Sequence, residues 1–165
     1  MTNSCDNKLN QANLETSTDF APIALDTFFP YQVVLLADKI GKTSAASAKR
    51  LHGLNISQWR VLAALADIPG RTATQVVAVT PMDQGIVSRA VKSLIDVGLV
   101  RRKASNTDGR LAHLYLTAAG KKKYAAIAQE MIVFDASLRT LLTSIENKQL
   151  DKILRKLVTG FSSVQ

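Results

Sequence analysis

The chain has 165 residues, 47% of them hydrophobic and 21% charged, which favours one folded domain and argues against a disordered chain. No apolar run approaches the roughly 20 residues of a transmembrane helix, and this excludes a membrane-spanning protein. The formal net charge of +8 favours an anionic partner, and nucleic acid is the first candidate. The positive charge is carried by the residues after position 30, because residues 1–30 have a net charge of −3.

The first residues of the chain are polar. Residues 1–24 show no apolar periodicity and predict a mobile tail, whereas residues 25–165 are expected to form a single domain. Cys5 is the only cysteine, so the chain has no internal disulfide. Because the start also lacks the apolar segment of a signal peptide, we expect a cytoplasmic protein. The pattern from Tyr31 to Leu51 predicts a first helix, with Pro30 tolerated in its first turn.

A second helix is predicted between Ser57 and Asp67. Ser57 is a favourable N-cap residue, and Ile56 before it is placed to pack on Val61 as a hydrophobic staple. Pro69 and the glycine that follows it are expected to stop this helix.

Two further helices are expected with only a short break between them. Thr72 and Gln75 have the spacing of a capping box, which predicts a short third helix that ends near Val79. Thr80 then resembles an N-cap, with Pro81 at the first position of a fourth helix. Two helices joined by so tight a turn indicate a helix-turn-helix motif.

The fourth helix is predicted to be amphipathic and to end at Gly98. The apolar residues at the spacing of a buried stripe are Val87, Ala90, Val91, Leu94 and Ile95. The residues on the opposite face include Gly85, Arg89, Lys92 and Asp96.

A β-hairpin and two long helices are expected after the fourth helix. Residues 99–103 and 110–116 alternate like strands and flank a polar turn at 104–109. Thr117 is a candidate cap for a fifth helix, and a sixth helix is expected from about Ser144. The apolar stripe of the sixth helix comprises Leu150, Ile153, Leu154, Leu157, Val158 and Phe161. The sequence therefore predicts a mainly helical fold with a small β-hairpin wing.

Four segments, in this order, resemble the MarR family of bacterial transcriptional regulators. They are Ile56-Ser-Gln-Trp-Arg-Val-Leu62, Val87-Ser-Arg89, Asp108-Gly-Arg110 and Leu116-Thr-Ala-Ala-Gly120. The resemblance implies a winged helix-turn-helix region at about 55–116, flanked by dimerisation helices at about 28–52 and 117–164. It also implies a homodimer, a pseudo-palindromic operator and a small aromatic effector that binds between the winged-helix region and the dimerisation helices. Gln84-Gly85 departs from the pattern, because many relatives carry Ser, Lys or Arg there.

The charge and polarity of the same region favour double-stranded DNA as the partner. Residues 80–123 carry a net charge of +6. The exposed face of the fourth helix is expected to enter the major groove, and the hairpin tip is expected to reach the minor groove through Arg110, held by Asp108. The candidate DNA-binding residues are Gln84, Gly85, Ser88, Arg89, Lys92, Asp108 and Arg110. We expect a sequence-specific regulator, acting as a ligand-responsive repressor.

Several features also have a plain structural interpretation. The basic runs at 101–103 and 121–123 are typical of solvated faces, and Trp59, Met131 and Phe134 are expected in the core rather than in an effector pocket. His52 and His113 are isolated in the sequence, so no metal site is predicted.

Two other functions stay open from the sequence alone. They are a nonspecific nucleic-acid-binding architectural protein and a winged helix used only for protein contacts. The motifs of hydrolases and P-loop enzymes are absent from the sequence, so we expect neither an enzyme nor a bound cofactor.

Overall fold

The computed structural model describes residues 22–104 and 112–161, with the side chain of Leu51 omitted. The predicted tail up to residue 21 and the hairpin tip, with Asp108 and Arg110, lie outside the described residues. Contacts divide the chain into two units, 1–37 and 38–165, and we describe each by itself. Their boundary falls within the first helix, α1 (Phe29–His52).

The described part of the first unit is a turn followed by the start of α1. Thr27 and Phe28 both donate backbone hydrogen bonds to the carbonyl of Ala24. Helix α1 begins two residues earlier than predicted and contains Pro30 in its first turn, where no intrahelical N–H bond is needed. The described apolar side chains of this unit are exposed in the single chain, Val34 at 65% among them.

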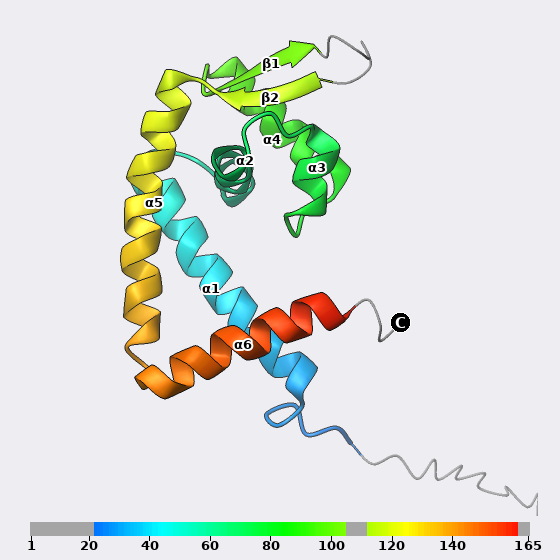
Figure 1. Ribbon diagram of the computed structural model, residues 1–165, viewed down its shortest axis with the longest axis vertical. Coiled ribbons are helices and arrows are strands. Elements are labelled where there is room, and N and C mark those ends of the chain that lie inside the picture. Colours follow the sequence, from blue (N-terminus) through cyan, green and yellow to red (C-terminus); the bar gives the residue numbers. More distant parts are fainter. Residues whose placement is uncertain (1–21, 105–111, 162–165) are drawn as a thin grey trace, which may run out of the picture. The chain divides into compact units, whose positions relative to one another are not determined.

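The second unit contains the end of α1 and seven further elements (Figure 1). They are α2 (Ile56–Asp67), α3 (Ala73–Ala78), α4 (Gln84–Asp96), β1 (Val100–Ala104), β2 (Ala112–Leu116), α5 (Ala118–Arg139) and α6 (Ser144–Gly160). The strands form an antiparallel hairpin in which Val100 pairs with Leu116 and Ala104 with Ala112. The predicted fold class, mainly helical with a small β-hairpin, is confirmed.

Helix α2 starts at a different cap from the predicted one. Its N-cap is Asn55, whose side chain accepts a hydrogen bond from the N–H of Gln58 at 2.9 Å, while Gln58 Oε1 accepts from the N–H of Asn55 at 2.9 Å. This reciprocal capping box satisfies two N–H groups and places Ile56 inside the helix. The prediction of Ser57 as the cap, with Ile56 as a staple before it, is therefore wrong.

Helix α4 also starts later than predicted. Asp83 is its N-cap and accepts a hydrogen bond from the N–H of Ile86 at 2.7 Å. The hydroxyl of Thr80 instead donates back to the carbonyl of Val76 in α3 at 2.7 Å, so Thr80 belongs to the end of the third helix. The prediction of Thr80 as the cap and Pro81 as the first helical residue is wrong, because a carboxylate at 83 caps more effectively.

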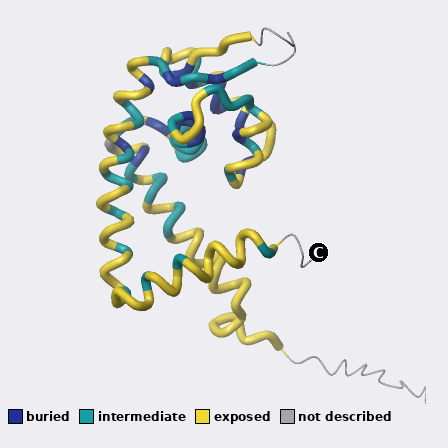
Figure 2. Tube along the Cα trace, viewed as in Figure 1, coloured by how far each residue is buried: buried dark blue, intermediate teal, exposed yellow. Residues whose placement is uncertain are grey.

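The core of the second unit lies between α2, α3, α4, the hairpin and the first half of α5 (Figure 2). Its large, fully buried side chains are Val61, Leu62, Leu65, Val76, Val87, Val91, Leu94, Leu114 and Ile127. Trp59 stacks on Tyr124 with ring centroids 5.6 Å apart, and both pack against this core. Met131 packs there too, which confirms the core prediction for Trp59 and Met131.

The hairpin is joined to the rest of the unit at two places. Gly70 donates to the carbonyl of Leu114, and Leu114 donates to the carbonyl of Arg71, both at 3.0 Å, so the segment between α2 and α3 continues the hydrogen bonding of β2. At the other end, the hydroxyl of Thr117 donates to the carbonyl of Gly98 at 2.7 Å and caps α5 by accepting from Gly120 at 3.0 Å. The orientation of the hairpin is therefore fixed by backbone hydrogen bonds at one place and by the Thr117 hydroxyl at the other.

Helix α6 keeps its apolar stripe exposed in the single chain. The predicted stripe residues Leu150, Ile153, Leu154, Leu157, Val158 and Phe161 are between 37% and 77% exposed. At the turn before α6, Arg139 pairs with Asp135 at 3.0 Å and with Asp151 at 3.2 Å, and so links the end of α5 to α6. Within the described ranges, no helix is long and apolar enough to cross a membrane.

Candidate nucleic-acid interface

One face of α4 is exposed and can contact a partner, because the opposite face is buried in the core. Val87, Ala90, Val91 and Leu94 are buried, and helical periodicity then turns the intervening residues outward. Five of the seven predicted site residues lie on this exposed face, namely Gln84, Gly85, Ser88, Arg89 and Lys92. The other two, Asp108 and Arg110, fall in the hairpin tip outside the described residues.

The position of α4 is fixed by a side chain that the sequence analysis missed. Gln58 Nε2 donates to Ser93 Oγ at 2.8 Å, while Gln58 Oε1 completes the capping box of α2. One amide therefore closes the start of α2 and holds α4 against it. The spacing Asn55-x-x-Gln58 is typical of a capping box, and it could have identified Gln58 from the sequence.

The first strand of the hairpin adds positive charge beside α4. Arg101, Arg102 and Lys103 are all exposed. The guanidinium of Arg101 lies over the ring of its cross-strand partner Tyr115, 4.8 Å from the ring centroid. Arg101 is exposed, as expected of a solvated face, and it also makes a cation–π contact that orients its guanidinium.

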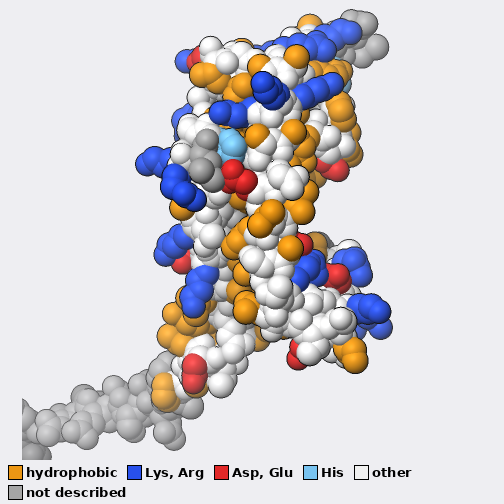
Figure 3. Space-filling view, turned by 90° about the vertical axis from the view of Figure 1, so that its left-hand side faces the viewer, with side chains coloured by type: hydrophobic (Ala, Val, Ile, Leu, Met, Phe, Trp, Pro, Cys, Tyr) orange, Lys and Arg blue, Asp and Glu red, His pale blue; other side chains and the backbone are white. Residues whose placement is uncertain are grey.

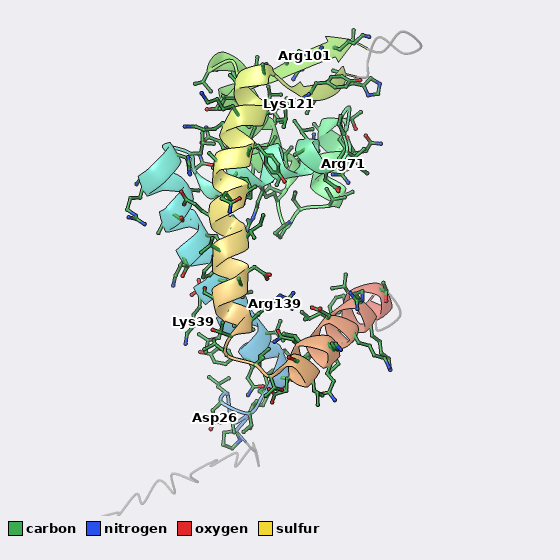
Figure 4. The ribbon with its side chains drawn as sticks, turned by 60° about the vertical axis from the view of Figure 1, so that its left-hand side comes forward. Asp26, Lys39, Arg71, Arg101, Lys121 and Arg139 are labelled. Atoms are coloured by element: carbon green, nitrogen blue, oxygen red, sulfur yellow. The ribbon has the colours of Figure 1, made fainter. Side chains whose placement is uncertain are left out.

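A second basic group lies at the start of α5. Lys121 and Lys122 are exposed and Lys123 is half-buried. Figure 4 places Lys121 and Arg101 at the same end of the unit, and Figure 3 shows Lys and Arg side chains gathered at that end. The first turn of α5 contains no acidic residue, although the positive end of a helix dipole disfavours cations. The positive charge at this end of α5 is therefore not offset by an acidic residue in the first turn of the helix.

Both histidines make contacts with residues that are distant in the sequence. His52 is not isolated in space, because its Nε2 lies 3.1 Å from Oε1 of Glu130, and Ser47 donates to the other oxygen of that carboxylate at 2.9 Å. The sequence did not indicate this pairing, because Glu130 is distant from His52 along the chain. His113 Nδ1 donates to the carbonyl of Gly70 at 2.8 Å. Among the residues that the structure describes, no His, Cys, Asp or Glu cluster could hold a metal ion.

Two open hollows flank the winged-helix region. One, of about 390 Å³, lies where α1 ends, β1 begins and α5 starts, and is lined by His52, Leu99, Ala119, Lys122, Lys123 and Ala126. The other, of about 330 Å³, lies between the α2–α3 segment and the hairpin, and is lined by Ile68, Pro69, Gly70, Arg71, Gln75, Ala78, Val79 and His113. Lysine and histidine side chains suit the first hollow to a small anion.

An exposed polar helix that directly precedes an antiparallel hairpin is the arrangement of a winged helix-turn-helix protein. Residues 52–111 match the model of the MarR family. The chain is 30% identical over 89 residues to the HTH-type transcriptional regulator BilQ from Clostridium symbiosum, over 54% of this chain and 62% of that protein. The match thus spans less than two thirds of that relative. Residues 52–111 are therefore similar to the corresponding region of MarR family regulators.

Solved structures of this family have the same fold. A MarR family transcriptional regulator from Silicibacter pomeroyi superposes with a TM-score of 0.74 at 26% identity, over 87% of this chain and 95% of that one. FabT of Streptococcus pneumoniae, in complex with DNA, superposes with a TM-score of 0.68 at 17% identity, over 82% and 96%. At that identity, FabT shows a shared fold only.

Proposed function

We propose that this protein is a transcriptional regulator that binds a specific double-stranded DNA sequence as a homodimer and acts as a ligand-responsive repressor. The observation that carries the proposal is the outward face of α4, with Gln84, Ser88, Arg89 and Lys92, beside the exposed cations of β1 and α5. These side chains donate to base edges and phosphates, and an α-helix fits the major groove. The fold shared with FabT, which was solved with DNA, supports the same partner.

The exposed apolar stripe of α6 supports the homodimer. Leu154 and Leu157 are 50% and 42% exposed in the single chain, and a run of such side chains is unfavourable in water. A second copy of the chain would cover it through an isologous interface. Two-fold symmetry would then present two α4 helices to half-sites about one helical turn of DNA apart.

The hollow beside His52 supports the response to a ligand. Lys122 and Lys123 would pair with a carboxylate, while Leu99, Ala119 and Ala126 would contact an apolar or aromatic body. A ligand here would contact both the winged-helix region and α5. If the ligand binds one arrangement of these parts more tightly than another, it shifts the protein towards that arrangement. The affinity for DNA can then change by at most the difference between the two binding free energies of the ligand.

Selection from a pool of random-sequence duplexes tests the proposal. We expect the full chain to enrich a pseudo-palindromic motif and to sediment as a dimer on it. Binding without an enriched motif would support the nonspecific architectural function instead. Absence of DNA binding even at low salt would support a winged helix used only for protein contacts.

A thermal-shift screen of small aromatic acids tests the ligand part separately. A ligand at one hundred times its Kd stabilises the state that it binds by about 2.7 kcal/mol. Hits that stabilise the protein but leave its DNA affinity unchanged would contradict the ligand-responsive mechanism.

A further inference from the structure

The first turn of α4 brings Gly85 together with two charged side chains. A β carbon built on Gly85 would lie 3.4 Å from Nη1 of Arg89 and 3.3 Å from Oδ1 of Asp83. The guanidinium of Arg89 therefore extends back across Gly85 towards the capping carboxylate. This direction is the natural one for a helical side chain, since residues i and i+4 share a face and side chains lean towards the N-terminus.

The guanidinium is held beside the carboxylate of Asp83 without a close pair forming between them. The ion pairs found among the described residues do not include one between Arg89 and Asp83. Asp83 uses the same Oδ1 atom to cap α4 through Ile86. The N-terminal end of the helix dipole disfavours a cation, and the nearby carboxylate offsets this effect. The donors of Arg89 thus stay available at the exposed start of the helix.

We propose that Gly85 determines DNA specificity through the space that it leaves, because this space lets Arg89 lie across the first turn of α4 and bind a guanine. The inference rests on the proposed function. It adds Arg89 as the residue that contacts a base and Gly85 as the residue that leaves room for it. An arginine fork matches the O6 and N7 acceptors of guanine in the major groove. A side chain at position 85 would compete with the guanidinium for the same volume.

The effect of Gly85→Ala separates specificity from folding. Position 85 is exposed and helical, and the gain in helix propensity from glycine to alanine offsets the tight contact of 3.3 Å between the added β carbon and the capping Oδ1 of Asp83, so the thermal midpoint should change little. The added β carbon lies 3.4 Å from Nη1 of Arg89, which is close van der Waals contact, so alanine restricts the guanidinium only slightly. Gly85→Leu fills more of the space and should act more strongly.

The experiment selects duplexes from a random pool and then titrates single-base variants of the enriched site. The proteins compared are the wild type, Gly85→Ala, Gly85→Leu, Arg89→Ala and the double variant Gly85→Ala/Arg89→Ala. We expect the wild type to prefer G·C at one position of each half-site by about five- to 150-fold. Arg89→Ala and Gly85→Leu should abolish this preference, and Gly85→Ala should reduce it. In the Arg89→Ala background, Gly85→Ala should have no further effect on it.

Two outcomes overturn the inference while the proposed function stands. One is a wild-type motif whose G·C preference survives in Gly85→Leu. The other is a preference that survives in Arg89→Ala at every position. A wild type that enriches no motif overturns the proposed sequence-specific function, and the inference with it. The enriched wild-type motif therefore distinguishes the two failures.

Discussion

Gly120 illustrates how one residue fixes the junction between the hairpin and α5. Its buried backbone packs against Leu99 so closely that an added β carbon would lie 2.0 Å from the carbonyl oxygen of Leu99. The same carbonyl accepts the backbone N–H of Thr117 at 3.0 Å. Neither side of this contact is a flexible side chain, so the conflict cannot be relieved by a rotamer change.

We therefore expect Gly120→Ala to destabilise the protein by about 2–4 kcal/mol. Gly41→Ala is the matched control in another helix and should be neutral or stabilise by up to about 1 kcal/mol. Urea unfolding at equal protein concentration compares the two variants. Equal stability of Gly120→Ala and the wild type would show that the contact between Leu99 and Gly120 is not rigid.

Substitutions of the hairpin cations distinguish contacts that attract any DNA by charge from contacts that recognise its sequence. We expect Arg102→Ala to weaken binding to all duplexes nearly equally and to lower the salt slope by about 0.9, because an exposed cation acts on phosphates.

Arg110→Ala should weaken operator binding more, with a loss that depends on the A·T content under the wing. Asp108→Ala should give a milder form of the same loss. Titrations at several salt concentrations measure these effects, and normal operator binding by Arg110→Ala would contradict a wing contact.

At the scale of the elements, caps decide where the helices begin. Thr143 and Glu146 form a capping box at the start of α6, in which Glu146 Oε2 accepts from the N–H of Thr143 at 2.7 Å. This backbone hydrogen bond, and then the one from the Thr143 hydroxyl, lowers the pKa of Glu146 below its ordinary value of 4.5. The carboxylate form is the one that caps α6.

This shift predicts a pH dependence for the first turn of α6. Because the pKa of Glu146 is lower in the folded chain, its stabilisation is complete above about pH 4.5 and is lost as the pH falls through the folded value. Glu146→Gln keeps the geometry of the box without the charge, so this part of the pH dependence should disappear. Thermal midpoints of both proteins between pH 3 and 6 measure it. Parallel pH profiles would contradict the role of the carboxylate.

At the scale of the whole molecule, the exposed stripe of α6 predicts how the protein assembles. Deleting residues 144–165 removes this apolar face, and we expect a monomer that has lost tight DNA binding. Leu154→Ser/Leu157→Ser should have the same effect without a deletion, and Lys148→Ser/Lys152→Ser is the control with the same helix and two other exposed positions. Sedimentation measures the assembly. A truncated chain that stays dimeric and binds its operator normally would show that the interface lies elsewhere.

The order of the elements, the buried stripe of α4 and the polar face opposite it could be predicted from the sequence, because they follow from local periodicity and turn chemistry. The sequence also placed the caps at Thr72 and Thr117 correctly. It misplaced the caps of α2 and α4, because several polar residues near each start compete and only the folded backbone selects one. The pairing of Gln58 with Ser93, of His52 with Glu130 and of Arg101 with Tyr115 was decided by tertiary structure alone. Such contacts join positions that are far apart in the chain or on facing strands, and no local pattern encodes which of the available partners a side chain meets.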